Sequence, residues 1–430
     1  MPYLVEQLNT DCLCGTLDGP GLAEAFTREI GDRDFAANLQ RTHPGLLSRQ
    51  QLFLSAGHAK RMQEIISAIE AVAGLPGYRD AVLAHAPEIA RFDPGPIGVF
   101  MGYDFHLGPD GPQLIEINTN AGGALLNAYL AEAQKACCAP AKTALPRPPT
   151  LEDLCEQFLA AFRAEWRLLG RTETLRSVAI VDDDPAVQFL YPEFQLFQRL
   201  LQRQGLIAVI ADGASLQCHD GALWHGSQKI DLVYNRLTDF ALAEPSHQAL
   251  HDAYLARTAA VTPNPRAHAL YADKRNLIAL GDAGQLRSWG VAPATISLLQ
   301  TGIAACELVT ADRAEALWQS RAKMFFKPAR GYGSKAAYRG DKITKRVWAE
   351  ILAGGYIAQA LVRPSARGVR LDGTTQMMKV DVRNYSYAGK VQLLVARLYQ
   401  GQTTNMRTPG GGFAPVFTAD EGTMAACRCL

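Results

Sequence analysis

The stretch YDFHLGPDGPQLIEINTNAGG, residues 103–123, has the pattern of two short strands and a tight turn. The segments 99–105 and 113–117 are strand-like runs. Gly108 to Pro112, which separates them, is a turn-rich cluster that continues neither a helix nor a strand. The sequence therefore predicts a β-hairpin in which the ends of two paired strands meet.

Three oxygen-bearing side chains lie on this hairpin: Asp104, Glu116 and Asn118. Glu116 and Asn118 are two residues apart, so on a strand both leave the same face while Ile117 points to the other. Mg²⁺ prefers hard oxygen ligands in near-octahedral geometry and usually shares them with nucleotide phosphates. The three residues are therefore predicted to bind magnesium that carries a nucleotide. The alternative is a polar hairpin end without a metal.

A glycine-rich loop follows a second strand-like run, in MFFKPARGYGSKAAYRG, residues 324–340. Lys327 ends the apolar run, and Gly331, Gly333 and Ser334 come next. Such a loop lets backbone N–H groups approach phosphate oxygens, while the lysine supplies a point charge. It is not a Walker A loop, because the pattern G-x-x-x-x-G-K-[ST] is absent. The alternative is an ordinary structural turn.

Near the C-terminus, two runs of alternating type, 379–387 and 391–399, are joined at Ala388-Gly389, which predicts a second hairpin. Arg383 and Arg397 project from its strands. From the pattern alone, either arginine could be a solvated residue on the face of a sheet.

The hairpin motif, an Asp-Phe pair followed by a short turn and Glu-Ile-Asn-Thr, resembles the metal-binding hairpin of the ATP-grasp ligases. In that family the first Asp and the E-x-N residues bridge two Mg²⁺ ions to ATP. Most members place this hairpin after two ATP-binding lysines, whereas here it comes first. This order resembles the circularly permuted members typified by eukaryotic glutathione synthetase and glutathionylspermidine synthetase. The likeness covers islands in about 95–130 and 265–417.

The resemblance implies a set of ATP contacts. Lys274, which opens a helix-like run over 273–280, matches the first ATP-contacting lysine, and Lys327 the second. The strand-like run 356–362 matches the segment whose backbone meets the adenine edge, at Gln359 and Leu361. The family usually has Glu where this chain has Gln359.

The resemblance also implies the residues that act on the transferred phosphoryl group. Arg397 and Arg383 would approach the γ-phosphate and an acyl phosphate, and Asn405, close to a Gly-rich loop, would help to hold metal or phosphate; Arg407 is a weaker candidate. One departure concerns the metal, because the glutathione synthetases carry a metal-binding Glu a few residues past the second lysine. Here Ala329 to Tyr332 stand in that region.

Between the first hairpin and Lys274, strands alternate with a helix. Strand-like runs cover 177–184, 205–213 and 229–240, and an amphipathic helix, kinked or shortened at Pro192, covers 187–204. This alternation predicts a parallel sheet with a ligand crevice at the carboxyl ends of its strands. The polar residues at those ends are candidate substrate contacts, with solvated turns as the alternative: Asp182, Asp183, Asp184, Asn235 and Arg236.

The predicted fold is therefore α/β: a circularly permuted ATP-grasp fold with a preceding Rossmann-like parallel-sheet domain and a helical N-terminal region. We expect six segments: a mostly helical region 1–95, which includes apolar helical spacing over 59–74; the metal-binding hairpin and a helix, 96–139; a Pro-rich linker, 140–150; an α/β substrate-side domain, 151–262; the smaller ATP-grasp subdomain, 263–358; and the remainder of the ATP-grasp core, 359–430.

Bulk properties exclude several classes of protein. Hydrophobic residues make up 48% of the 430 and charged residues 20%, which argues against disorder. The net charge of +1 gives no reason to expect nucleic acid or a charged membrane surface as a partner. No signal sequence or long apolar stretch is visible, so we expect a cytoplasmic protein.

The function expected from these features is an ATP-dependent carboxylate–amine, or thiol, ligase that forms an amide through an acyl phosphate. ATP, Mg²⁺ (two ions) and small-molecule carboxylate and amine substrates would be its ligands, and a homodimer remains open. The alternatives are a nucleotide-binding module without catalysis and a kinase-type phosphotransferase.

Overall fold

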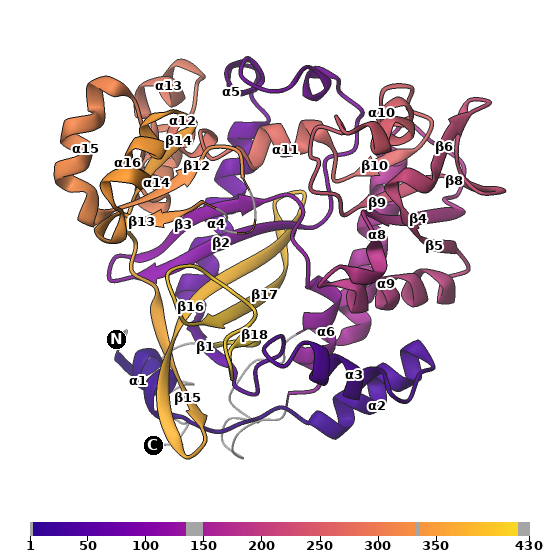
Figure 1. The fold of residues 1–430 in the computed structure, drawn as a ribbon, viewed down its shortest axis with the longest axis horizontal. Helices are drawn as coiled ribbons and strands as arrows, with labels where there is room; N and C mark the ends of the chain where they lie inside the picture. Colours follow the sequence, from indigo (N-terminus) through magenta and orange to yellow (C-terminus); the bar gives the residue numbers. More distant parts are fainter. Residues whose placement is uncertain (1–2, 135–148, 332, 334–335, 420–430) are drawn as a thin grey trace.

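The computed structural model describes residues 3–134, 149–331, 333 and 336–419. A central sheet lies between a parallel sheet on one side and a smaller antiparallel sheet on the other (Figure 1). The predicted linker 140–150 falls almost entirely outside the described residues, as does Ser334. Among the helices that are described, none is long and apolar enough to cross a membrane.

The central sheet has the strand order β1-β18-β17-β16-β2-β3, and β15 pairs with β16 outside this path. All neighbours are antiparallel except β1 and β18, which run parallel. The strands are β1 (Leu52–Ser55), β2 (Met101–Gly108), β3 (Gly111–Asn118), β15 (Ser365–Leu371), β16 (Thr374–Tyr387), β17 (Lys390–Tyr399) and β18 (Gly412–Ala419). The sheet thus joins the predicted first hairpin to the C-terminal one, because β2 pairs with β16.

Both predicted hairpins are present, with one change of bounds. The turn between β2 and β3 is only Pro109–Asp110, since Gly108 pairs with Gly111 and Leu107 with Pro112. A proline is tolerated near the start of a strand at a sheet edge, so Pro112 belongs to the strand and not to the predicted turn. The second hairpin turns at Ala388 (φ 49°) and Gly389 (φ 75°), the left-handed pair that a tight two-residue hairpin requires.

The two faces of β16 explain where the core and the polar residues lie. Val380 and Val382 are fully buried in the core beneath α4 (Ala56–Ala73), whose predicted apolar stripe packs on the sheet. The odd-numbered residues Asp381, Arg383 and Tyr385 leave the opposite face. Tyr385 packs there with α6 (Ala124–Glu132), and the two charged residues lie beside the first hairpin.

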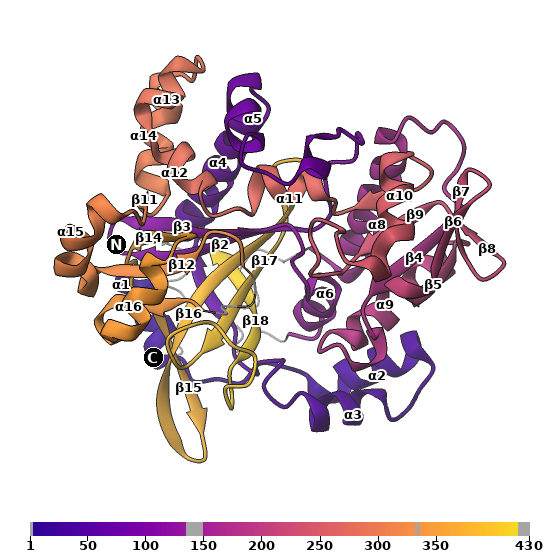
Figure 2. The same ribbon diagram turned by 45° about the horizontal axis from the view of Figure 1, so that its top comes forward.

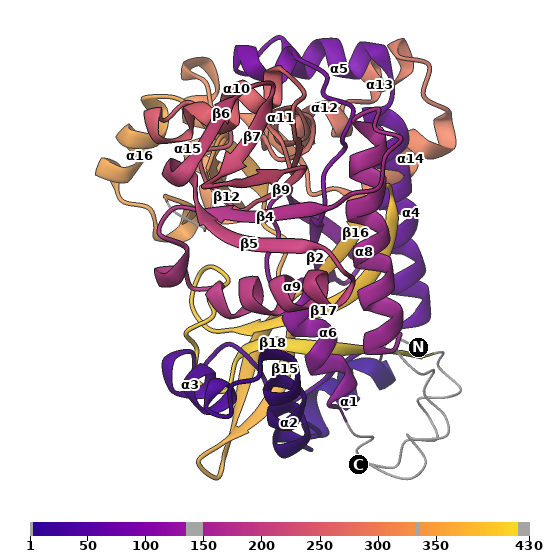
Figure 3. The same cartoon turned by 90° about the vertical axis from the view of Figure 1, so that its right-hand side faces the viewer.

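The parallel sheet has the order β10-β9-β4-β5, with β4 (Ser177–Asp182), β5 (Ile207–Asp212), β9 (Leu232–Asn235) and β10 (Ala260–Thr262). Figure 3 shows its strands one above the other, with α8 (Leu151–Leu168) and α9 (Tyr191–Arg203) beside them. Parallel pairing was predicted; the start of the helix was not. The helix begins at Tyr191, because Pro192 fits its first turn, where no N–H is needed.

A small sheet, β6-β7-β8, follows β5 and was not predicted. Its strands are β6 (Leu216–His219), β7 (Ala222–His225) and β8 (Gln228–Ile230), so the single predicted run 229–240 is divided between β8 and β9.

The third unit contains the two predicted lysines. Its antiparallel sheet has the order β11-β14-β12-β13 and lies beside the β2–β3 hairpin (Figure 2). The strands are β11 (Cys306–Leu308), β12 (Met324–Pro328), β13 (Tyr338–Arg339) and β14 (Tyr356–Ala360). The helices are α11 (Pro265–Tyr271), α12 (Asn276–Gly281), α13 (Ala283–Ser288), α14 (Pro293–Gly302), α15 (Ala314–Ser320) and α16 (Lys345–Leu352).

The N-terminal region is mostly helical, as predicted: α1 (Tyr3–Asp11), α2 (Gly19–Ile30), α3 (Phe35–Thr42), α4 and α5 (Pro76–Leu83). It also supplies β1 to the central sheet, which sequence reasoning missed. Arg367 on β15 ties these parts together, because its guanidinium donates to carbonyl oxygens of Asn9, Cys12, Gln51 and Gly368 at 2.6–2.9 Å. The division of the chain into six segments stays a prediction.

We predict that Arg367→Met lowers the free energy of unfolding by about 3 kcal/mol or more, because buried carbonyl oxygens lose their donors at roughly 1–3 kcal/mol each. Urea denaturation measures this change. Arg370→Met, an exposed position on the same strand, is the matched control and should stay within about 0.5 kcal/mol of the wild type. Equal effects of the two substitutions would contradict the anchoring role.

Candidate active site

Asp104 lies at the centre of a buried charge network. On β2 it stands opposite Glu116 of β3 and opposite Arg383 of β16, and its side chain is almost wholly buried. Arg383 donates from Nε to Oδ1 and from Nη2 to Oδ2, both at 2.7 Å. Oδ2 also accepts from Nη2 of Arg397 at 2.7 Å and from Nδ2 of Asn118 at 3.0 Å. Of these four hydrogen bonds, Oδ2 accepts three and Oδ1 accepts one.

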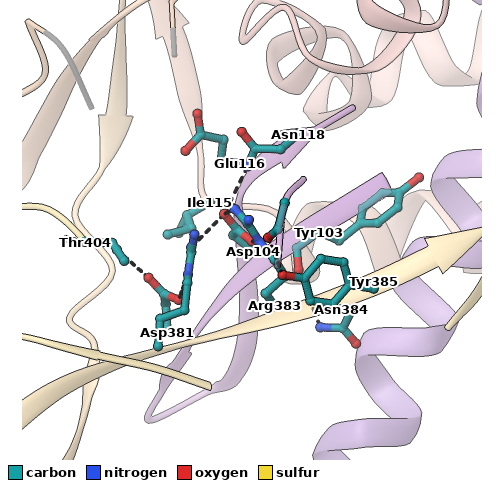
Figure 4. A network of polar contacts seen from close by, with 12 residues as sticks. Tyr103, Asp104, Ile115, Glu116, Asn118, Asp381, Arg383, Asn384, Tyr385 and Thr404 are labelled. Carbon is teal, nitrogen blue, oxygen red and sulfur yellow. Dashed lines mark hydrogen bonds and ion pairs between the residues drawn. The ribbon is translucent and has the colours of Figure 1, made fainter. Parts of the chain in front are cut away.

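Arg397 connects this centre to a second carboxylate. It stands opposite Asp381 on the β16–β17 ladder and donates from Nε to Oδ1 of Asp381 at 2.6 Å. The other oxygen of Asp381 accepts from the hydroxyl of Thr404, on the loop after β17 (Figure 4). A Cβ at Gly102 would lie only 3.1 Å from Nε of Arg383, so the absence of a side chain there leaves room for the guanidinium.

The two predicted lysines reach the same hairpin from the third unit. Lys274 lies just before α12, and its Nζ contacts Oε1 of Glu116 at 3.1 Å and the carbonyl of Gly331 at 2.9 Å. Lys327, near the end of β12, donates to the carbonyl of Ile115 at 2.9 Å. The hairpin is therefore held between arginines of the central sheet and lysines of the third unit.

Burial and these cations set the protonation of the site. Burial alone would raise the pKa of Asp104, but Arg383 and Arg397 hold that pKa below its ordinary value. Burial would also raise the pKa of Glu116, but Lys274 and Lys327 hold that pKa below its ordinary value. Burial also lowers the pKa of Lys327, an effect that Glu116 opposes. At neutral pH both carboxylates are ionised.

Two cavities meet at Glu116. One, of about 680 Å³, lies between the β12–β14 sheet and the loop after β17, and its walls include Phe325, Leu361 and Tyr399. The other, of about 1210 Å³, lies between the hairpin and the parallel sheet and is lined by Arg383 and Arg397 among others. Glu116, Lys274 and Gly331 line both cavities.

The structure therefore brings most of the predicted site residues together. Lys327, Gln359 and Leu361 line the smaller cavity, while Asn118 and Gly333 line the larger. The side chain of Gln359 is buried and donates to the carbonyl of Ile115 at 3.2 Å.

Asn405 has a different environment from the one expected. Its Nδ2 donates to the carbonyl of Gln400 at 2.8 Å, and its Oδ1 accepts from the backbone N–H of Arg407 at 3.1 Å. It organises its own loop, and Thr403 and Thr404 of that loop line the smaller cavity. A role for Asn405 in holding metal or phosphate stays a prediction.

The candidates on the parallel sheet separate into two groups. Asp182 and Arg236 line the larger cavity. Asn235 instead accepts from the N–H of Leu237 and donates to the carbonyl of Pro263, so it organises the backbone after β9. Asp183 pairs with His247, outside the two cavities.

Sequence reasoning missed three contributors to the site. Asp381 accepts from Arg397, and Thr404 donates to Asp381. His268 stacks on Phe240, with ring centroids 3.7 Å apart, in the wall of the larger cavity. Burial and nearby Lys274 lower the pKa of His268 to about 3, so this ring is neutral. Asp381 lies two residues before Arg383 on an alternating strand, which was a usable signal; nothing in the sequence pairs residues 240 and 268.

No protein-family model matches the chain, and no curated protein matches it. Among solved structures, a glutathione synthetase-like effector from Globodera pallida, in its apo form, aligns over 87% of this chain and 90% of its own, with 12% identity and a TM-score of 0.57. This likeness establishes the fold, and the predicted α/β fold of the ATP-grasp type is confirmed. The circular permutation stays a prediction.

Two further alignments have TM-scores below 0.5. A putative γ-glutamylcysteine synthetase from Methylobacillus flagellatus aligns over 84% of this chain and 86% of its own, with 10% identity and a TM-score of 0.45. The ATP-grasp ligase PsnB, solved with a minimal precursor, Mg and ADP, aligns over 56% of this chain and 87% of its own, with 15% identity and a TM-score of 0.30.

We predict that Asp104→Asn destabilises the protein by about 3–5 kcal/mol, because two buried guanidinium groups lose a shared counter-charge. Glu116→Gln is the control on the partner strand, where the side chain is 26% exposed, and should cost much less. Chemical denaturation of both variants measures the difference.

Asp104→Asn should also change how the stability of the protein depends on pH. The pKa of Asp104 is lower in the folded protein than in the unfolded chain, so its contribution is present above the unfolded pKa of about 3.9 and is lost as pH falls through the folded pKa. Asp104→Asn should therefore remove part of the acid-induced loss of stability. An unchanged acid profile together with unchanged stability at pH 7 would contradict the central role of Asp104.

Proposed function

We propose that the protein is an ATP-dependent ligase that joins a carboxylate to an amine, or to a thiol, through an acyl phosphate. The observation that carries this proposal is the meeting of two cavities at Glu116 and Lys274. One cavity suits a nucleotide and the other an acid, so a phosphoryl group could pass between them at the junction.

The smaller cavity supports the nucleotide half of the proposal. Phe325, Leu361 and Tyr399 give it apolar walls suited to a base, and Lys327 and Lys274 stand at its polar end. In this proposal the backbone near Leu361 meets the adenine edge and the lysines bind phosphates. Each lysine now donates to a backbone carbonyl, an exchangeable contact that phosphate oxygens could replace.

The residues at the junction fit magnesium in part. Glu116 and Asn118 project from the same side of β3, next to Asp104 (Figure 4). Asn118 donates its amide nitrogen to Asp104, which leaves its amide oxygen for a cation. Asp104 itself already accepts four hydrogen bonds, so we assign it the task of orienting Asn118 and the two arginines. When bound with ATP, Mg²⁺ would neutralise phosphate charge and polarise the transferred group.

The arginines suit the transferring phosphoryl group. Within the described part of the chain, Arg383 and Arg397 use Nε and Nη2 for their carboxylate contacts. Arg383 also contacts Tyr385, whereas Nη1 of Arg397 is left for a ligand. Because Asp104 and Asp381 fix both side chains before substrate binds, little reorganisation is needed as charge develops.

The larger cavity supports a carboxylate substrate. Arg236 lies in its wall with 7% of its surface exposed, and its Nε has no hydrogen-bond partner among the described residues. A buried guanidinium with an unsatisfied N–H is a suitable anchor for a carboxylate. Asp182, also in this wall, could bind the positively charged end of an amino acid.

The chemistry follows from these assignments. A carboxylate oxygen attacks the γ-phosphorus of ATP and ADP leaves, which gives an acyl phosphate. The amine then attacks the acyl carbon, phosphate leaves, and the amine loses a proton as the amide forms. Positioning and charge neutralisation account for these steps, and no nucleophilic side chain is required.

The experiment that tests the function is incubation of the purified protein with ATP and Mg²⁺ and with pooled amino acids, short peptides and polyamines. Phosphate release and new product masses are measured, with hydroxylamine added in parallel to trap an acyl phosphate. A ligase releases phosphate in an amine-dependent way. A kinase gives a stable phosphorylated product. A nucleotide-binding module without catalysis produces no ADP under any of these conditions. A cytoplasmic location belongs to the same proposal, and a homodimer stays an open alternative.

We predict that Glu116→Gln lowers ATP turnover by roughly 100-fold or more while the fold survives, because the junction loses a charge that offsets several phosphates. Steady-state phosphate release measures this. Glu307→Gln, an acidic residue of the third unit outside both cavities, is the control and should leave turnover near the wild-type rate. Turnover of Glu116→Gln within about threefold of wild type would exclude the assignment.

We also predict that Lys327→Met weakens ATP binding more than it changes thermal stability, because a phosphate-binding lysine gains its energy from the ligand. The measurement is the rise in melting temperature caused by a non-hydrolysable ATP analogue with Mg²⁺. Lys323→Met, at an exposed position of the same segment, should retain the full rise. A normal rise in the Lys327 variant would mean that this lysine is structural.

A further inference from the structure

A second group of metal-type ligands lies at the carboxyl end of the parallel sheet, outside both cavities. Asp183 follows β4, and Glu244 and His247 lie on the segment after β9, where His247 ends the 3₁₀ turn Pro245–His247. One ligand atom from each of these three side chains lies within 4.8 Å of the others.

His247 is the fixed member of the group. Its ring is fully buried, Nδ1 lies 2.9 Å from Oδ2 of Asp239, and Nε2 lies 2.8 Å from Oδ1 of Asp183. Asp239 is itself held by the backbone N–H of Glu244, at 2.9 Å. A carboxylate on one ring nitrogen is the usual support of a metal-binding histidine, because it fixes the tautomer and aims the other nitrogen at the ion.

The charge around this ring favours a cation. If both ring nitrogens carry protons, one imidazolium faces the carboxylates of Asp183, Asp239 and Glu244, and negative charge remains in excess. Asp212 adds to this excess, since its Oδ2 accepts from the backbone N–H of Asp184 beside Asp183. Replacing the Nε2 proton by a divalent ion would reduce the excess by one charge while the Nδ1–Asp239 contact stays in place.

We propose that Nε2 of His247 and the carboxylates of Asp183 and Glu244 bind one divalent transition-metal ion, for which Zn²⁺ is the best match. One imidazole and two carboxylates form a hard-to-borderline ligand set that suits Zn²⁺, with a position left for water. On binding, Nε2 gives its proton to solvent and Asp239 keeps the proton on Nδ1. This ion is separate from the magnesium of the proposed ATP site.

The position of the group indicates what the ion would do. Asp182 on one side, and Thr238 and Phe240 on the other, line the larger cavity and are chain neighbours of Asp183 and Asp239. An ion shared by Asp183, Glu244 and His247 would therefore cross-link β4 to the 239–247 segment and fix one wall of that cavity.

The test is a calorimetric titration of the full, metal-stripped chain with Zn²⁺, in the wild type and in Glu244→Gln. Glu244 is exposed, so this variant keeps the fold. We expect the wild type to bind one more equivalent of Zn²⁺ than the variant, or to bind it at least 10-fold more tightly. Asp239→Asn, which alters only the support of the ring, should weaken binding by about 10–100-fold.

The matched control is His251→Gln. His251 also lies beside a carboxylate, with Nδ1 3.2 Å from Oδ1 of Asp252, but it belongs to no group of three metal-type ligands among the described residues. It should keep the full Zn²⁺ binding, and binding by cysteine thiolates would be equal in all variants. Wild-type binding no different from that of Glu244→Gln, or an equal loss in His251→Gln, would overturn the proposal.

Discussion

The buried carboxylate of Asp104 determines how the rest of the structure can be arranged. A charge with 1% exposure is tolerated only when its hydrogen bonds and its counter-charge are supplied by the protein. Arg383 and Arg397 supply both, and they come from strands almost 300 residues away in the sequence. The first hairpin can therefore lie only where β16 and β17 present these two side chains, so the network fixes the register between the two hairpins.

The balance of charge around the hairpin is uneven in a way that suits polyphosphate. Four cationic side chains surround three carboxylates. The cations are Arg383, Arg397, Lys274 and Lys327, and the carboxylates are those of Asp104, Glu116 and Asp381. Both arginines of the central sheet pair with buried aspartates, whereas Lys274 pairs with Glu116 and a backbone carbonyl, and Lys327 donates to a backbone carbonyl. In the proposed function, the fixed arginines would meet the charge that develops during the reaction, and the lysines would bind the nucleotide.

One departure from the ATP-grasp pattern gains meaning from this geometry. The resembling synthetases carry a metal-binding Glu a few residues past the second lysine, where this chain has Ala329 to Tyr332, with no acidic residue. Within this region Gly331 lines both cavities, and its carbonyl accepts from Lys274. In the proposed function Asp104 orients Asn118 and the arginines, so Glu116 and Asn118 are the residues proposed to bind the metal and the most sensitive test of that chemistry.

The sequence by itself determined whatever depends on neighbouring residues. Both hairpins, the parallel pairing of β4 and β5, the helix α4 and the shared face of Glu116 and Asn118 all follow from local period and turn chemistry, which act over a few residues. Tertiary structure alone decided three features. Strand β1 completes the central sheet, the Asp104 carboxylate pairs with two arginines, and His268 stacks on Phe240. Such choices depend on contacts between distant segments. The free energy of burying a charge or a four-residue strand becomes favourable only when the partner surface is present, and no local pattern records that partner.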